Sequence, residues 1–142
     1  MTVKQILREK GNQIISIAED DSVLDVSKLL GERRVGAVLV MKGDTLAGII
    51  SERDIIRGLS IRGGDVLGDK VESLMTRSVV TCTGTDSIHD LMEMMTERRI
   101  RHVPVEEEGK IIGVISIGDV VKERISETEH EAEALKQYIT SA

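Results

Sequence analysis

Apolar and polar positions along the chain follow the same order twice, first in residues 14–59 and again in residues 79–124. Each copy opens with an extended apolar segment, which is followed by apolar residues at helical spacing and then by two short apolar runs. The extended segments are 14–17 and 79–82, and the runs are 35–41, 46–51, 100–105 and 111–116. A second helix is expected to start at Asp54 or Asp119. Each copy therefore predicts the order β-α-β-β-α.

The first helix of each copy has a start signal and an apolar stripe. Ser22 and Ser87 are candidate N-caps, and Asp25 and Asp90 three residues later complete the pattern of a capping box. The stripes consist of Val23, Val26, Leu29 and Leu30 in the first copy, and of Ile88, Leu91, Met92 and Met95 in the second. Because methionine is a flexible filler of cores, we expect both stripes to be buried.

The two copies align without a gap at an offset of 65 residues, from position 14 to position 79. Identical pairs include Asp21/Asp86, Ser22/Ser87, Asp25/Asp90, Arg34/Arg99, Gly48/Gly113, Ser51/Ser116 and Asp54/Asp119. A chance similarity would lose its register at the turns, so the chain is a tandem duplication. One copy is too small to bury both faces of its sheet, and we expect the two copies to pack around a pseudo-twofold axis.

These features predict a mixed α/β (α+β) protein with four regions. They are a first repeat with an N-terminal helix (1–62), a linker (63–78), a second repeat (79–126) and a C-terminal helical tail (127–142). The tail extends the last helix, because residues 123–139 are highly charged and place Ile125, Leu135 and Ile139 at helical spacing. Two interpretations of this extension fit equally well, a contact within a dimer and a solvated cap on the fold.

Composition and charge narrow the class of protein. The chain has 142 residues, and its Lys+Arg 19 against Asp+Glu 25 give a formal net charge of −6. An acidic chain without a basic tail disfavours binding to DNA. The sequence has no Trp, no Phe and one Tyr, so the core must be aliphatic and the aromatic platforms that stack single-stranded bases are absent.

Cys82 is the single cysteine, which excludes an intramolecular disulfide and a zinc site of several cysteines. It is compatible with a reducing cytoplasm. The apolar runs are short, for example 37–41, and fall far below the roughly 20 residues that cross a bilayer. The first eleven residues lack the apolar region of a signal peptide. We therefore expect a soluble, cytoplasmic protein that does not contact a membrane.

Each copy ends in a glycine, two aliphatic residues, a serine and, three residues further on, an aspartate. The two segments are Gly48-Ile49-Ile50-Ser51-Glu52-Arg53-Asp54 and Gly113-Val114-Ile115-Ser116-Ile117-Gly118-Asp119, supported by Met75-Thr76 and by Arg101-His102-Val103-Pro104-Val105. With these motifs, over about residues 10–126, the chain resembles a tandem pair of cystathionine-β-synthase (CBS) domains, or Bateman module. We expect the pair to be free-standing.

The resemblance implies a regulatory module for signal transduction that senses an adenosyl ligand and acts through a partner protein or its own oligomer. AMP is the first expectation, and ADP, ATP, NAD(H) or S-adenosylmethionine are the others. The chemistry fits: an aspartate at a helix start can accept both ribose hydroxyls, and the helix dipole favours its charge. The preceding glycine permits close approach of the backbone. The resemblance also implies a homodimer, and a regulated protein that the sequence does not identify.

Two ligand sites are implied. The first consists of Ser51, Arg53, Asp54, Thr76, Val80, Arg101 and His102, and the second of Gln13, Ile15, Val35, Gly36, Ala37, Ser116, Gly118 and Asp119. At the repeat offset, Gly118 replaces Arg53, and the pair 36–37 replaces Arg101 and His102. The first site thus gathers cations for a phosphate. We expect the second site to bind AMP more weakly, to stay empty, or to accept a bulkier ligand such as a dinucleotide.

The same residues have simpler interpretations, which stay open. The two Ser-x-x-Asp motifs also fit helix caps that bind no ligand. His102 fits a satisfied interior residue. The arginine pairs 33–34 and 98–99 lie at helix ends, where they complement the helix dipole.

The sequence shows no catalytic constellation. Cys82 falls at an apolar strand position of the repeat, which predicts a buried small side chain. His89 and His130 have no partner at metal-ligand spacing, and no Walker-type phosphate loop is present. We therefore expect no enzyme and no metal. Three functions remain: an adenine-nucleotide sensor, which we favour, a ligand-free structural or interaction module, and a nucleic-acid binder, which the net charge disfavours.

Overall fold

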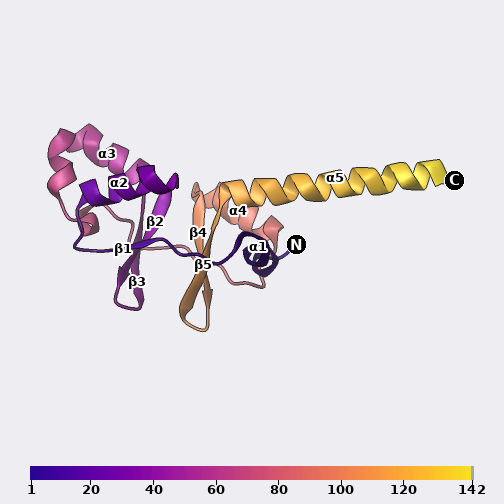
Figure 1. Ribbon diagram of the computed structural model, residues 1–142, viewed down its shortest axis with the longest axis horizontal. Coiled ribbons are helices and arrows are strands. Elements are labelled where there is room, and N and C mark those ends of the chain that lie inside the picture. The colour runs from indigo at the N-terminus through magenta and orange to yellow at the C-terminus, as the bar shows by residue number, and fades with distance from the viewer. Residues whose placement is uncertain (142) are drawn as a thin grey trace. The chain divides into compact units, whose positions relative to one another are not determined.

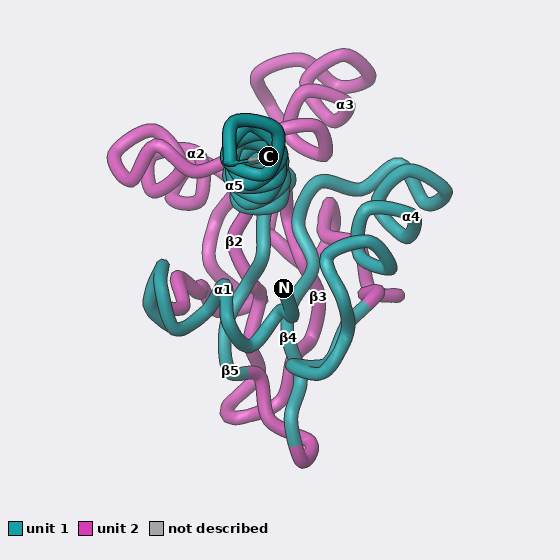
Figure 2. Tube along the Cα trace, turned by 90° about the vertical axis from the view of Figure 1, so that its right-hand side faces the viewer, with its two compact units in different colours: residues 1–12, 81–107, 112–142 teal, residues 13–80, 108–111 magenta. Residues whose placement is uncertain are grey.

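The structure is a computed structural model and describes residues 1–141. Two compact units make up the chain (Figure 2). Unit 1 comprises residues 1–12, 81–107 and those from 112 on, and unit 2 comprises residues 13–80 and 108–111. In both units helices pack on a small sheet, which confirms the mixed α+β class (Figure 1).

Unit 2 contains a three-stranded sheet of order β1-β2-β3, in which β1 pairs parallel to β2 and β2 pairs antiparallel to β3. Its elements are β1 (Ser16–Ala18), α2 (Val23–Arg33), β2 (Ala37–Lys42), β3 (Thr45–Ser51), α3 (Glu52–Arg62) and the 3-10 turns η1 (Gly63–Gly68) and η2 (Val71–Ser73). The predicted order β-α-β-β-α is therefore confirmed for the first repeat.

Unit 1 contains a two-stranded sheet of β4 and β5. Its elements are α1 (Val3–Lys10), α4 (Ile88–Arg98), β4 (His102–Glu107), β5 (Lys110–Ser116) and α5 (Ile117–Ser141), with the turn at 108–111 grouped with unit 2. A two-residue loop joins β4 to β5, and both of its residues, Glu108 and Gly109, have positive φ (52° and 77°). That is the backbone of a type I′ turn, whose twist matches that of the flanking strands.

The expected first strand of the second repeat is reduced to one residue. Cys82 forms a parallel bridge with Val105, at the position where Ile17 pairs with Val40 in the first repeat. In β2 the N–H of Leu39 donates to the Ile15 carbonyl at 3.2 Å. The residue that corresponds to Leu39 is Pro104, which has no N–H to donate. One hydrogen bond of the ladder therefore cannot form, and pairing stops at the bridge.

The two cores repeat at the same offset as the sequence. In unit 2 the buried residues include Val23, Val26, Leu30, Val38, Val40, Ile50 and Ile55, and in unit 1 they include Ile88, Leu91, Met95, Val103, Val105, Ile115 and Val120. Each residue of the second set lies 65 positions after its counterpart. Cys82 is 3 % exposed and belongs to the core of unit 1, as predicted. Buried positions alternate along β3 and β5, which fixes the register of these strands, whereas β2 and β4 each bury three consecutive residues.

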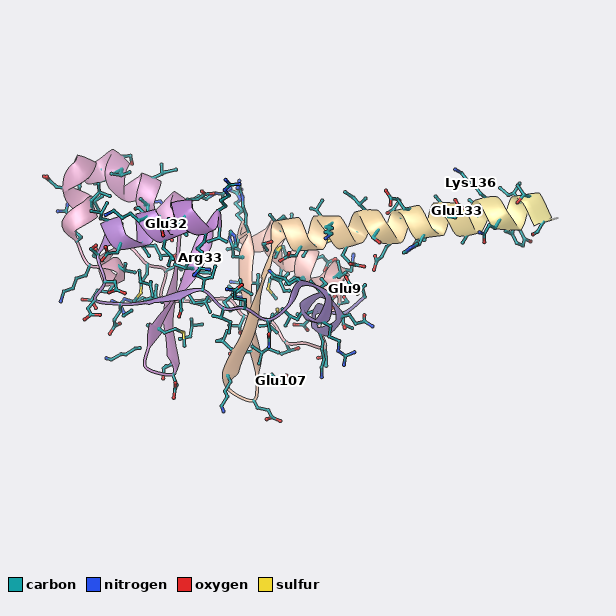
Figure 3. All side chains as sticks on the ribbon, in the orientation of Figure 1. Glu9, Glu32, Arg33, Glu107, Glu133 and Lys136 are labelled. Atoms are coloured by element: carbon teal, nitrogen blue, oxygen red, sulfur yellow. The ribbon has the colours of Figure 1, made fainter. Side chains whose placement is uncertain are left out.

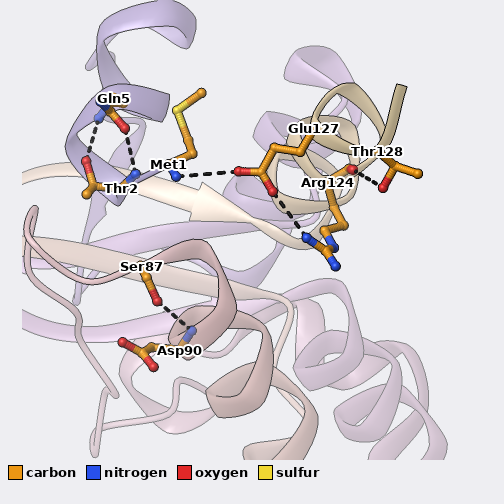
Figure 4. Close-up of polar contacts among 8 residues, drawn as sticks. All are labelled: Met1, Thr2, Gln5, Ser87, Asp90, Arg124, Glu127 and Thr128. Carbon is orange, nitrogen blue, oxygen red and sulfur yellow. Dashed lines mark hydrogen bonds and ion pairs between the residues drawn. The ribbon is translucent and has the colours of Figure 1, made fainter. Parts of the chain in front are cut away.

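The segment before each repeat packs in the unit of the other repeat. The N-terminal helix α1, which the sequence analysis groups with the first repeat, places Val3, Ile6 and Leu7 in the core of unit 1. The linker places Val71 and Met75 in the core of unit 2. Helix α1 begins with a full capping box between Thr2 and Gln5 (Figure 4). These short segments complete cores that one repeat alone leaves open.

Helix ends follow the sequence signals. Ser22 and Ser87 accept a hydrogen bond from the N–H of Asp25 and Asp90, both at 3.0 Å, which confirms the two N-caps. The expected capping boxes are wrong, because the side chains of Asp25 and Asp90 do not return a bond to the serine N–H. Both helices, α2 and α4, are followed by an arginine, Arg34 and Arg99, in the left-handed conformation with φ of 54° and 55°. Glycine is the usual residue at such a position, because it has no Cβ to clash. An arginine there costs backbone strain in both repeats.

The predicted helical extension at the C-terminal end is confirmed. Helix α5 runs without a break from Ile117 to Ser141 and projects beyond the rest of unit 1 (Figure 1). In the first half of α5, Glu127 accepts a hydrogen bond from Arg124 at 3.3 Å and pairs with the N-terminal ammonium of Met1 at 3.4 Å (Figure 4). Among residues 1–141, no helix combines the length and the apolar character needed to cross a membrane.

Candidate functional site

The first Ser-x-x-Asp motif forms the start of α3, directly after β3. The N–H and the hydroxyl of Ser51 donate to Oδ2 of Asp54 at 2.9 and 3.1 Å, and the Asp54 N–H donates back to the hydroxyl at 3.3 Å. The motif is therefore a complete capping box, and α3 begins at Glu52, two residues before the expected start. All three bonds leave Oδ1 unused. Its nearest cation is Arg57, at 3.9 Å.

The second motif repeats this geometry at the start of α5. Ser116 donates to Oδ2 of Asp119 from its N–H at 2.9 Å and from its hydroxyl at 3.0 Å, and the return bond measures 3.2 Å. Both motifs are therefore helix caps, and this capping does not by itself exclude a ligand. Capping fixes each carboxylate at a helix N-terminus, where the partial positive charge of the helix also favours an anionic side chain.

A backbone hydrogen bond ties each motif to the loop before the neighbouring strand. In unit 2 the N–H of Glu52 donates to the Gly36 carbonyl at 2.9 Å. In unit 1 the N–H of Ile117 donates to the Arg101 carbonyl at 2.8 Å. The two bonds are equivalent at the repeat offset. Each unit therefore holds a capped aspartate next to an exposed or half-buried strand entry, either at 36–37 or at 101–102.

Lys10 is the clear difference between the two motifs. Its Nζ donates to Oδ2 of Asp119 at 2.6 Å and to the Val114 carbonyl at 2.8 Å. The residue 65 positions later is Met75, which carries no charge and packs in the core of unit 2. Sequence analysis missed this contact, because residue 10 lies outside the aligned repeats and α1 precedes the first repeat rather than the second.

The environment of Asp119 favours its ionised form. Burial opposes the charge, but hydrogen bonds from Lys10 and from the Ser116 N–H, together with the charge of Lys10, hold the pKa of Asp119 below its usual value. The Lys10 and Asp119 side chains are 35 % and 22 % exposed. The pair is thus partly shielded from solvent, and any ligand that uses this carboxylate must share it with a resident cation.

The other predicted site residues lie in the two units as follows. In unit 2, Thr76 pairs with Ile49 through two backbone hydrogen bonds of 2.8 and 3.0 Å, and Ile15 accepts from Leu39. Arg53 and Gln13 are exposed, and Val80 and Val35 are half-buried. In unit 1, Arg101 and Gly118 are exposed, and His102 begins β4 half-buried. Both predicted sites combine residues of the two units, so their assembly stays a prediction.

The glycines of the two motifs allow other segments of the same unit to pack closely against them. A Cβ on Gly48 would lie 2.7 Å from the Thr76 carbonyl oxygen and 2.9 Å from the Met75 sulfur. A Cβ on Gly113 would lie 2.7 Å from Cδ2 of Leu7. The expectation from sequence was that these glycines let the backbone approach a ligand. The close packing of the preceding segments requires them instead.

Two surface cavities lie elsewhere. One of about 160 Å³ in unit 1 is lined by Met1, Ser87, Ile88, His89, Met92, Arg124 and Glu127. One of about 400 Å³ in unit 2 is lined by Ala18, Glu19, Asp20, Met41, Lys42, Gly43, Lys70 and Glu72. Neither contains a residue of the predicted sites. Within residues 1–141, no group of three or more His, Cys, Asp or Glu side chains is placed to hold a metal ion.

The family profile described as "CBS domain" matches residues 3–61 and 71–126, two segments that follow the two repeats. They cover more than half of the chain. The protein therefore belongs to the CBS domain family, as a tandem pair.

Known proteins agree with this assignment. The chain is 35% identical over 147 residues to the CBS domain-containing protein CBSX3, mitochondrial, of Arabidopsis thaliana, covering 97% of this chain and 71% of the relative. The crystal structure of the CBS-domain containing protein ATU1752 from Agrobacterium tumefaciens superposes with a TM-score of 0.86 at 39% identity, over 87% of this chain and 99% of that one. The CBS domain protein PAE2072 from Pyrobaculum aerophilum, complexed with AMP, gives a TM-score of 0.74 at 28% identity, with coverages of 84% and 89%.

Proposed function

We propose that this protein is a non-enzymatic sensor of adenine nucleotides, with AMP as the first ligand to test. The observation that carries the proposal is the doubled Ser-x-x-Asp motif, in which a capped carboxylate is held at a helix N-terminus in both units. Membership in the CBS domain family and the AMP complex of the Pyrobaculum relative support it. Its output passes through a regulated protein or through its own oligomer.

The chemistry of the first motif suits a ribose. Oδ2 of Asp54 is used by the cap, whereas Oδ1 has only Arg57 at 3.9 Å, which exceeds hydrogen-bond distance. A carboxylate oxygen with free lone pairs can accept from a ribose hydroxyl, and the side chain is only 11 % exposed, so such a bond would be partly shielded from water. Arg53, one residue earlier on the exposed face of α3, can contribute charge towards a phosphate.

We propose that the second motif is the weaker nucleotide site. Gly118 stands where the first motif has Arg53, so one cation is lost at the helix start. Lys10 already neutralises Asp119 at the oxygen that also serves the cap. A nucleotide would either displace Lys10 or use it as a phosphate partner. NAD(H), S-adenosylmethionine, a homodimer and a cytoplasmic location remain predictions of the same kind.

The test compares two aspartates that occupy the same helix position. Asp25 and Asp54 both lie three residues after a capping serine, but only Asp54 belongs to the motif of a glycine, two aliphatic residues, a serine and an aspartate. We expect calorimetry to detect AMP binding to the wild type, about tenfold or weaker binding to Asp54→Ala, and unchanged binding to Asp25→Ala. An Asp54→Asn variant keeps an oxygen for the cap and should fold while losing the anionic acceptor.

Two outcomes would contradict the proposal. If Asp54→Ala binds AMP like the wild type and only loses stability, by about 1 kcal/mol, Asp54 is only a cap. Asp25→Ala should be close to neutral in stability, because the Asp25 side chain makes no capping hydrogen bond. If no adenosyl compound raises the melting temperature of the wild type, the chain is a ligand-free structural or interaction module, because a ligand that binds the folded state must stabilise it. GMP is the matched control, since its 6-oxo group needs hydrogen-bond partners opposite to those of the adenine amino group.

A further inference from the structure

Helix α5 has an exposed stripe with a seven-residue repeat. The stripe consists of Val121, Ile125, Thr128, Ala132, Leu135 and Ile139, and successive members are separated by alternating steps of four and three residues. At about 100° per residue, the six positions fall within an arc of about 80° on the helix surface. All six are exposed, with Ile125 at 54%, Leu135 at 59% and Ile139 at 65%. A 4-3 spacing is the pattern of the a and d positions of a coiled coil.

The body of unit 1 does not cover this stripe. Val120 is buried in the core, and Glu127 pairs with the N-terminus of Met1, so these two residues mark the docked side of α5. They lie about 100° to 120° around the helix from the centre of the stripe. From residue 128 to residue 141 every residue is exposed, and Glu133 and Lys136 project outwards (Figure 3). A helical segment of this length is marginally stable alone in water, and an apolar stripe on it needs a partner.

The charges beside the stripe favour one partner and one orientation. With the stripe at a and d, position e holds Lys122, Glu129 and Lys136, and position g holds Arg124, Glu131 and Tyr138. In a parallel pair, a residue at g faces the residue at e five positions later in the other helix. Arg124 then meets Glu129, and Glu131 meets Lys136, each pair occurring twice by symmetry. All four contacts join opposite charges.

The antiparallel alternative brings like charges together. With the stripes fully overlapped, e faces e and g faces g, so that Lys122 meets Lys136, and Glu129 and Glu131 each meet their own copy. Like charges at these positions oppose association. The pattern therefore discriminates between the two orientations of the same helix.

We propose that α5 forms a parallel, in-register, two-stranded coiled coil with α5 of a second copy of this chain. The stripe makes the buried seam, the four g–e pairs set the orientation, and Thr128 and Ala132 make the middle of the seam the weak part. This proposal concerns the C-terminal helix alone and does not depend on the proposed nucleotide sites.

A cysteine in the seam tests the proposal directly. Ala132→Cys places identical thiols opposite each other only in a parallel, in-register pair, whereas Glu133→Cys, one residue further along, points away from the seam. The native Cys82 is buried, so we expect it to form no disulfide in either variant. Under mild oxidation we expect a disulfide-linked dimer of the full chain from Ala132→Cys, at least about tenfold faster than from Glu133→Cys.

Further variants test whether the apolar stripe causes the cross-link and whether the two helices are parallel. Leu135→Glu should abolish the cross-link in the Ala132→Cys background, whereas Gln137→Glu, on the opposite side, should not. Glu131→Lys and Lys136→Glu should each weaken dimer formation by roughly fivefold, and the double variant should restore it. Two outcomes would overturn the proposal: a dimer in which Ala132→Cys does not cross-link, and equal cross-linking at 132 and 133. Preferential cross-linking between Thr128→Cys and Ala132→Cys chains would also overturn it, because it would show an antiparallel pair.

Discussion

The Nζ atom of Lys10 lies 2.6 Å from Oδ2 of Asp119, although the two residues are 109 positions apart in the chain. The equivalent carboxylate of the first repeat, Asp54, has its nearest cation, Arg57, on its own helix at 3.9 Å. Two motifs that share the Ser-x-x-Asp pattern and the capping geometry therefore differ in charge environment. The difference comes from α1, a segment outside both repeats.

Removing the Lys10 charge should release Asp119. We expect Lys10→Met to increase AMP binding at the second motif, seen in calorimetry as a larger stoichiometry or a tighter second phase. It should lower the free energy of unfolding by no more than about 1 kcal/mol, because both side chains are partly exposed. Arg8→Met is the matched control, since it removes a positive charge from the same helix without touching Asp119. Weaker AMP binding in Lys10→Met would show that Lys10 contacts the ligand instead.

The depressed pKa of Asp119 predicts a pH-dependent contribution to stability. A carboxyl group whose pKa is lower in the folded than in the unfolded state stabilises the protein above the usual aspartate pKa of about 3.9. The contribution is lost as the pH falls through the folded value. Urea unfolding should therefore show Asp119→Asn to be less stable than the wild type at pH 7, with a gap that closes towards acid. A gap that is constant with pH would rule out ionisation as its source.

The left-handed arginines predict stabilisation by glycine. Arg34→Gly and Arg99→Gly should each raise the free energy of unfolding by up to about 1 kcal/mol, because glycine adopts a φ near 55° without a Cβ clash. Arg33→Gly tests the reverse case one residue earlier, at the last residue of α2, where glycine should destabilise by up to about 0.5–1 kcal/mol. If Arg34→Gly also destabilises, the arginine side chain makes a contact that outweighs the strain.

The two motif glycines should differ in their tolerance of alanine. At Gly48 the new Cβ would meet a backbone carbonyl oxygen, that of Thr76, which cannot move without disturbing its pairing with Ile49. At Gly113 it would meet the end of the Leu7 side chain, which can change rotamer. Thermal unfolding should thus give a loss of about 1–3 kcal/mol for Gly48→Ala and a smaller one for Gly113→Ala. Gly31→Ala, in open space on α2, should stabilise the protein.

The sequence by itself determined the duplication, the order of elements and the helix N-caps. These features are local or periodic: Ser22 and Ser51 sit three residues before an aspartate, and buried positions recur at the helical or strand period. The Ser-x-x-Asp motifs were visible for the same reason, as was the helical extension after residue 126. Pro104 was visible too, but its effect on the strand at Cys82 required knowing which residue lies opposite.

Only the tertiary structure decided which segments complete each core and which charges meet. That α1 packs beside the second repeat, that Lys10 reaches Asp119, and that Gly48 and Gly113 make room for Met75 and Leu7 are contacts between residues distant in the chain. No short-range pattern encodes them, because they depend on which apolar surface a segment buries once the chain has folded back. Because α1 packs into the core of unit 1, Lys10 lies next to Asp119 and sets the charge environment of that carboxylate.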